Sequence, residues 1–316
     1  MKKKTTVLVS FILILGVLAS SSIVAQEPPA GQDGKRASIS VDVALVDVPF
    51  TVTDKKGRSI RNLKRESFKV YEDDRLQTIK NFSAEANLPM TIALLVDTSG
   101  SVKERLRFEQ EAAVQFFKSA LVQKKDRAAV LSFDTRVDLV QDFTDDANVL
   151  AGAVRKMRAG GGTALHDAVH LAVTKKLAGE DGRRIIVMIT DGDDTSSRLS
   201  MNTALEDAQR NDVIIYAIST NSTGLGGEKN KKGDDVLKRF TETTGGKVFF
   251  PDKLEDLSSN FNSIREELRF QYALAYSPTN LLRDGAFRRI RIEPANKDHM
   301  ARARTGYFAP FAPATP

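Results

Sequence analysis

The sequence of 316 residues contains no cysteine. The chain therefore has no disulfide bond, no thiolate ligand for a metal, no cysteine nucleophile and no cysteine that a lipid could modify. A chain without disulfides must be held together by its own hydrophobic core. The length suits two modest domains, or one large domain with appendages.

Long apolar runs are also scarce, and the one at the N-terminus is short for a membrane span. Lys2–Lys4 precede an apolar run from Val7 to Leu18, and a small polar stretch that ends in "IVAQ" follows. This order is typical of a secretory signal peptide, with cleavage expected after Ala25. An uncleaved anchor is the alternative. We expect a secreted or periplasmic protein with no transmembrane segment after cleavage of residues 1–25.

Neither sign of charge dominates the chain. The formal net charge is +6, and residues 1–25 hold three lysines and no acid, so cleavage leaves +3. The composition, 41% hydrophobic and 28% charged, is ordinary for a soluble globular protein. Charge alone therefore names no partner. Nucleic acid is not expected for a secreted protein that lacks aromatic residues interleaved with basic ones.

The chain divides into segments of different pattern. Residues 26–37 are polar and rich in Pro and Gly, as in a linker. Alternating apolar residues predict β structure over 38–88 and again over 269–309, before a tail at 310–316. A phase shift beside Pro49 predicts a bulge or break in the first strand. Each β segment is short of core, so we expect one small β-sandwich-like domain built from both; two separate appendages are the alternative.

Residues 89–268 alternate strand and helix patterns. The near-continuous apolar runs "IALLV", "RIIVMI" and "VIIYAI" are typical of central strands covered on both faces. The segment therefore predicts a doubly wound, mostly parallel six-stranded α/β sheet. Strands are expected at 91–97, 127–133, 137–141, 184–190, 213–219 and 246–250. Helices are expected at 103–121, 146–157, 164–178, 201–211, 233–243 and 253–268.

Oxygen-bearing side chains follow these strands at the edge where open α/β sheets bind ligands. Asp97, Ser99 and Ser101 follow the first strand, Thr163 follows three glycines, and Asp191 ends a second central strand. Such a set suits a hard cation, Mg²⁺ foremost, with Ca²⁺ or Mn²⁺ possible. Taken singly, these residues also suit helix caps or a turn. Their convergence on one sheet edge favours a metal site.

The motifs "DTSGS", "GGGT" and "TDG" resemble the metal-ion-dependent adhesion site of von Willebrand factor type A domains, over about residues 89–268. The flanks "NLKRESFKVYEDDRLQTIKNF" and "ARTGYFAP" look like a bacterial secreted group built on this domain. The resemblance implies that Ser99, Ser101 and Thr163 give hydroxyl oxygens to the metal. It implies that Asp97 and Asp191 act through waters and by orienting the hydroxyls. Neutral hydroxyls would leave the ion attractive to an Asp or Glu carboxylate of a partner protein.

We therefore expect a metal-dependent binding or adhesion module and not an enzyme. A metal-dependent hydrolase that uses the same cation, and a structural domain with a vestigial site, are the alternatives. Rim residues are expected at Gly162, His166, Asp193 and Asp194. The long Gly-rich loop at 221–233 is a candidate specificity loop.

Two further patterns have both a functional and a purely structural interpretation. "HDAVH" places His166 and His170 on one helix face, as in H-E-x-x-H zinc sites, but an Asp stands where that motif needs Glu. A catalytic zinc site is therefore not expected. The arginines of the last strands predict a solvated sheet face, with an anionic polymer or lipid head group as the alternative. They are Arg288, Arg289, Arg291, Arg302 and Arg304.

Overall fold

The computed structural model describes residues 45–84, 88–221 and 230–312. The expected signal peptide, the linker, the start of the first β segment and most of the 221–233 loop lie outside these ranges. No helix within them combines the length and the apolar character that crossing a bilayer requires.

Six strands form the expected α/β sheet, in the order β6-β5-β4-β7-β8-β9. Neighbours are parallel except β5 and β6, which are antiparallel. The predicted fold is therefore confirmed. The strands are β4 (Met90–Asp97), β5 (Arg127–Phe133), β6 (Val137–Thr144), β7 (Arg183–Thr190), β8 (Val213–Ser219) and β9 (Val248–Phe249).

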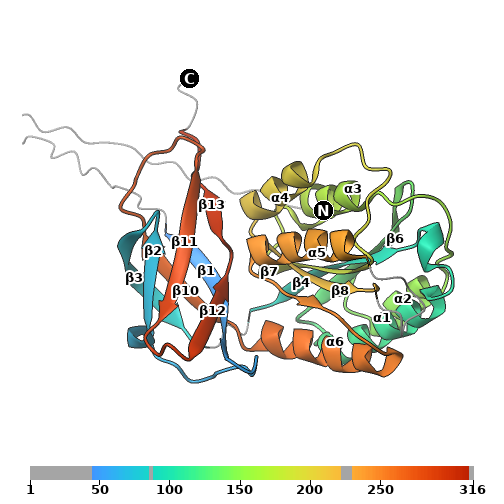
Figure 1. The fold of residues 1–316 in the computed structure, drawn as a ribbon, viewed down its shortest axis with the longest axis horizontal. Coiled ribbons are helices and arrows are strands. Elements are labelled where there is room, and N and C mark those ends of the chain that lie inside the picture. The colour runs from blue at the N-terminus through green and yellow to red at the C-terminus, as the bar shows by residue number, and fades with distance from the viewer. Residues whose placement is uncertain (1–44, 85–87, 222–229, 313–316) are drawn as a thin grey trace, which may run out of the picture. The chain divides into compact units, whose positions relative to one another are not determined.

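Helices cover both faces of this sheet (Figure 1). Every residue of β4 is buried, and its side chains alternate between the two faces. Leu94 packs in one core cluster with Phe116, whereas Leu95 packs in the other with Phe240. The first face carries α1 (Leu106–Ala120), α2 (Ala147–Val154) and α6 (Leu254–Arg269). The second carries α3 (Leu165–Leu171) with its π-helical extension (Ala172–Leu177), α4 (Met201–Arg210) and α5 (Lys231–Thr244).

The two β segments share one curled antiparallel sheet, in the order β12-β1-β10-β3-β2-β11-β13. The expectation of one combined module is confirmed, because β10 from the C-terminal segment pairs with β1 and β3 from the N-terminal segment. The strands are β1 (Val46–Asp54), β2 (Phe68–Glu72), β3 (Arg75–Ser83), β10 (Tyr272–Ser277), β11 (Phe287–Pro294), β12 (His299–Ala303) and β13 (Gly306–Phe308).

The expected break beside Pro49 is absent, and that prediction was wrong for the described strand. β1 runs through Pro49 with an unshifted register against β10. The ladder with β12 begins only at Phe50, so the missing N–H of Pro49 falls at its end and interrupts no pairing there. The irregularity of this sheet lies instead between β10 and β3, where the register shifts at Ala275 and Tyr276.

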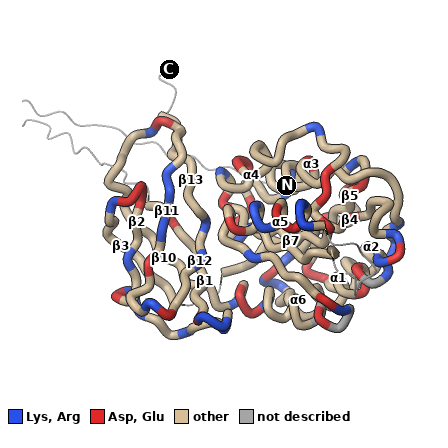
Figure 2. Tube along the Cα trace, viewed as in Figure 1, with Lys and Arg blue, Asp and Glu red and all other residues tan. Residues whose placement is uncertain are grey.

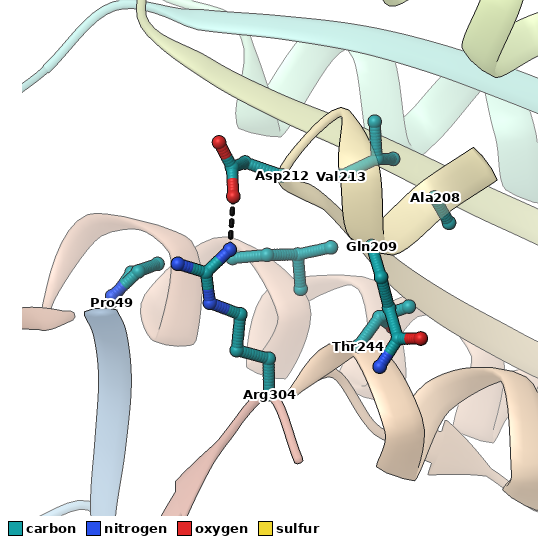
Figure 3. Close-up of a pocket in the computed structure, with 8 residues that line it drawn as sticks. Pro49, Ala208, Gln209, Asp212, Val213, Thr244 and Arg304 are labelled. Carbon is teal, nitrogen blue, oxygen red and sulfur yellow. Dashed lines mark hydrogen bonds and ion pairs between the residues drawn. The ribbon is translucent and has the colours of Figure 1, made fainter. Parts of the chain in front are cut away.

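The β module meets the α/β domain where α4, α5 and α6 end. Arg304 pairs with Asp212 beside a small pocket lined by Pro49 and Thr244, among others (Figure 3). Arg302 likewise pairs with Glu267 on α6. Asp212 directly precedes β8, so this contact lies at the amino ends of the parallel strands. The carboxyl ends, where the site residues are expected, are at the opposite edge of the sheet.

The arginines of the last strands form the expected solvated face in part. Arg289 and Arg291 are exposed, and each has an exposed carboxylate partner, Asp74 and Glu293. Arg288 departs from the expectation, because it is buried and donates to both carboxylate oxygens of Asp284, at 2.8 and 3.0 Å. Acidic and basic residues are interspersed over both parts of the fold (Figure 2).

We predict that Tyr272→Ala lowers the free energy of unfolding by about 3–5 kcal/mol, the usual cost of deleting a large buried aromatic side chain. Tyr272 is 1% exposed and its ring stacks on Phe50 at 5.3 Å. Its hydroxyl donates to the Ile60 carbonyl and accepts from the Leu63 N–H. Urea unfolding measures the change. Leu282→Ala, at a side chain 65% exposed, is the control and should change little.

Candidate metal centre

Asp97, the last residue of β4, is fully buried beneath the carboxyl edge of the sheet. One of its carboxylate oxygens accepts the Ser99 N–H at 2.9 Å, and the other accepts the Thr190 hydroxyl at 2.7 Å. The first bond turns the chain over the end of β4, and the second joins β4 to β7. Asp97 therefore faces inward and fixes the loop that carries the two serines.

Ser99, Ser101 and Asp191 form a chain of oxygens above Asp97. The hydroxyls of Ser99 and Ser101 lie 3.0 Å apart, and the Ser101 hydroxyl donates to Asp191 Oδ2 at 2.9 Å. Ser99 and Asp191 are buried, whereas Ser101 is exposed. The expected alternation of the two serines therefore does bring both hydroxyls together, with one at the protein surface.

Thr163 lies in a loop that is fastened to both of these segments. The Gly160 N–H donates to the Thr98 carbonyl at 2.8 Å, and the Gly100 N–H donates to the Gly161 carbonyl at 3.0 Å. On the other side, the Thr163 N–H donates to Thr195 Oγ1 at 2.9 Å. Thr163 itself is 5% exposed. The structure thus brings the three expected loops to one place through backbone hydrogen bonds.

The glycines before Thr163 have a steric role. Gly161 has a φ of +84°, which disfavours any residue with a Cβ. At Gly162 an added Cβ would lie 2.3 Å from Ser196 Oγ. The Gly162 N–H also donates to Thr135 Oγ1 at 2.8 Å. Side chains at these positions would push the Thr163 loop away from its neighbours.

The expected rim residues connect α3 with the loop after β7. The His166 N–H donates to Asp194 Oδ1 at 3.3 Å, and the His166 ring nitrogen Nδ1 lies 3.3 Å from Asp194 Oδ2. Asp193 is exposed and accepts a hydrogen bond from the Asn230 side chain at the start of α5. These residues hold the loops around the oxygen chain.

The second histidine of the "HDAVH" motif is separate from the first. His170 Nδ1 lies 2.6 Å from Asp207 on α4, so each histidine has its own carboxylate. Among residues 45–84, 88–221 and 230–312, no three His, Asp or Glu side chains are grouped to hold a metal. The two histidines therefore do not converge on a shared carboxylate.

Sequence reasoning missed several residues of the centre. Asn221 donates from its side chain to the Asp191 carbonyl at 2.6 Å. Arg105 is 7% exposed, and its guanidinium Nη2 lies 3.8 Å from Asp191 Oδ2. Glu109 on α1 is 1% exposed. Two of them had a visible signal. Asn221 begins the 221–233 loop, the candidate specificity loop, and Glu109 falls three residues after Leu106 on the otherwise apolar stripe of α1.

Burial governs the charges of the centre. It raises the pKa of Asp97 to about 6, and the nearby charge of Asp191 adds to the rise while the Ser99 N–H opposes it. Burial likewise raises the pKa of Glu109 well above its usual value, with Asp97 raising it further and Arg105 lowering it. Ionising these buried carboxylates is therefore unfavourable, and a bound cation would offset that free-energy cost.

The oxygen spacing fits a small divalent cation. In an octahedron with Mg–O bonds of about 2.0–2.1 Å, adjacent ligand atoms lie about 2.9 Å apart. The Ser99–Ser101 and Ser101–Asp191 separations are 3.0 and 2.9 Å. This spacing is also that of ordinary hydrogen bonds, so the same three oxygens can bond one another or share one ion. The donor set is all oxygen, as Mg²⁺ prefers.

Comparison with known proteins agrees with this geometry. The sequence model of the family described as von Willebrand factor type A domain matches residues 91–263. An uncharacterized protein of Synechocystis is 23% identical over 192 residues, which cover 58% of this chain and 43% of that protein. One of Borreliella burgdorferi is 25% identical over 224 residues, 66% of this chain and 62% of that protein. The chain thus spans less than two thirds of either relative.

Among solved structures, the chain is similar in fold to proximal thread matrix protein 1 from the mussel byssus, in a form with a zinc-occupied MIDAS motif. The TM-score is 0.50 and the identity 16%, and the match covers 61% of this chain and 48% of that one. At that identity the likeness bears on the fold alone.

We predict that stability in EDTA falls as the pH rises from about 4 to 7. The folded protein keeps a proton on Asp97 up to about pH 6, whereas the unfolded chain loses it near the ordinary value of 3.8. The unfolded state thus binds fewer protons across this window, so a rising pH favours unfolding. A shift of about two pKa units corresponds to about 3 kcal/mol. Thermal melts at a series of pH values measure it.

Asp97→Asn should reduce this pH dependence, because it keeps the size of the side chain and removes one titrating group, while Glu109, whose pKa is also raised, keeps its share. Asp207→Asn, beside His170, is the control at a carboxylate outside the centre. A slope in Asp97→Asn as steep as in the wild type would contradict the assignment.

Proposed function

The chain belongs to the von Willebrand factor type A family, and on that premise we propose that it is a binding module that holds a divalent cation, Mg²⁺ foremost. The cation engages an acidic group of a partner protein. Ser99, Ser101 and Thr163 supply hydroxyl oxygens, and Asp97 and Asp191 orient them.

One observation carries this proposal: the two serine hydroxyls stand at the spacing of neighbouring ligands of Mg²⁺, and the Asp191 carboxylate orients Ser101 by accepting its hydroxyl. Their supports also suit the role. Asp97 is held by two hydrogen bonds, so the loop that presents the serines is fixed before an ion arrives. A preformed site loses little conformational entropy on binding.

The chemistry of the ligands explains why the partner should be acidic. Hydroxyl oxygens are neutral, so they coordinate the ion without cancelling its charge. The ion therefore retains affinity for a further anionic oxygen. Ser101 is the exposed member of the set, which supports an ion whose open side faces solvent.

A binding role also fits the rest of the chain. The N-terminal residues have the pattern of a secretory signal peptide, which supports a secreted or periplasmic location. The histidine pair, the other metal site considered, is divided between two carboxylates. The hydrolase alternative uses the same cation as the binding proposal, and we infer binding rather than catalysis.

We predict that Ser99→Ala and Ser101→Ala each weaken Mg²⁺ binding by at least about 10–100-fold, the loss typical of disturbing even a supporting residue at a metal site. Isothermal titration of Mg²⁺ into EDTA-treated and dialysed protein measures the affinity. Thermal melts verify that each variant is folded.

Ser263→Ala is the matched control, because Ser263 is exposed on α6 and its hydroxyl donates to the Ser259 carbonyl. It should leave the Mg²⁺ affinity unchanged. The proposed site is refuted if the two site variants bind Mg²⁺ as tightly as this control.

We further predict that partner capture depends on carboxyl groups of the partner. The immobilised protein is incubated with bacterial envelope proteins in Mg²⁺, in EDTA, and in Mg²⁺ after carbodiimide amidation of the envelope proteins. Binding should occur only in the first case, because amidation turns carboxylates into neutral amides that bind a cation poorly. Capture that survives amidation would exclude an acidic contact.

A further inference from the structure

Beneath the oxygen chain lie two buried residues with ionisable side chains that the proposed function does not use, Arg105 and Glu109. Arg105 directly precedes α1, and Glu109 lies one turn further along it. They are 7% and 1% exposed. The guanidinium Nη2 of Arg105 lies 3.4 Å from the Ser101 carbonyl and 3.8 Å from Asp191 Oδ2. The positive group thus faces the same carboxylate oxygen that accepts the Ser101 hydroxyl.

Several polar atoms of these two side chains have no hydrogen-bond partner within the described part of the chain. Both carboxylate oxygens of Glu109 and the Nε of Arg105 are buried without a hydrogen-bond partner. An unsatisfied buried ion is strongly unfavourable. Residues four apart on a helix lie on the same face, so the fork of Arg105 and the carboxylate of Glu109 are within reach of each other. Arg105 therefore has two carboxylates within reach, those of Asp191 and Glu109.

We propose that Arg105 competes with the divalent cation for Asp191, and that Glu109 accepts the guanidinium when the cation takes its place. The proposal rests on the proposed function, since it concerns the regulation of that site. Arg105 forms its ion pair with Asp191 when no ion is bound there. A doubly charged ion at Ser101 and Asp191 repels the guanidinium, which turns to Glu109 and satisfies the two unpaired oxygens.

This exchange has two consequences. Arg105 sets the metal affinity, because the ion must displace it. Cation binding also transfers the ionic contact of Arg105 from Asp191, in the loop after β7, to Glu109 on α1. The packing of α1 against that loop therefore depends on the ion. An ordinary structural ion pair does neither, because its two members only stabilise each other.

The test measures Mg²⁺ affinity by titration calorimetry in three variants. Arg105→Gln should bind Mg²⁺ about tenfold more tightly than the wild type, because the competing guanidinium is gone. Glu109→Gln should bind about tenfold more weakly, because the displaced guanidinium has no carboxylate to accept it. Factors of this size are usual for coupled sites. The double variant leaves no unpaired buried ion, so it should fold. It should also bind more tightly than the wild type.

Arg210→Gln is the matched control, since Arg210 pairs with Glu206 four residues earlier on α4, away from the centre. It should leave the affinity unchanged. Opposite shifts in the two single variants support the competition. Equal affinities, or shifts in the same direction, overturn it while leaving the metal site intact. A wild type that binds no divalent cation overturns both proposals.

A second measurement uses stability and does not depend on the calorimetry. A double-mutant cycle between Arg105→Gln and Asp191→Asn, followed by urea unfolding, should give a coupling energy in EDTA that disappears in saturating Mg²⁺. The same coupling in both conditions would show that Arg105 stays on Asp191, and would exclude the exchange.

Discussion

A carboxylate inside a protein must be given hydrogen bonds in place of water, and the centre is built around one such group. Asp97 ends the central strand and accepts the Ser99 N–H and the Thr190 hydroxyl. Because both carboxylate oxygens of Asp97 are used in these bonds, the loop beyond it is fixed over the end of the strand, with Ser99 buried and Ser101 exposed. The neighbouring loops then bind to this fixed turn, through Gly160 and Gly100.

The sheet topology makes this convergence possible. β4 lies between β5 and β7, and all three are parallel, so the loops that follow β4 and β7 leave the same edge. The β module contacts the other end of the domain, where Asp212 precedes β8. The centre is consequently left uncovered by that module. The α/β domain is inserted between the two β segments, so strands from distant parts of the chain pair in a single antiparallel sheet.

Charged side chains are concentrated at the centre. The carboxylates of Asp97, Asp191 and Glu109 and the guanidinium of Arg105 are all buried, whereas Ser101 is exposed. Burial holds the Asp97 carboxyl against ionisation, which raises its pKa to about 6. A cation beside Ser101 would relieve this cost and would act on Arg105 and Glu109 at the same time. Binding and the internal charges of α1 are therefore parts of one electrostatic system.

The sequence by itself determined the α/β fold, since apolar runs such as "IALLV" and amphipathic helices allow few other arrangements. It also determined the oxygen-bearing residues of the centre, because the ends of parallel strands meet at one edge whatever the details of packing. The tertiary structure alone decided the rest. The straight course of β1 through Pro49 depends on where β12 begins to pair. The partners of Arg288, Arg302 and Arg304 depend on which carboxylates the fold brings beside them. Arg105 meets Asp191 across 86 positions of sequence, a contact that local pattern cannot encode because only packing brings α1 against the loop after β7.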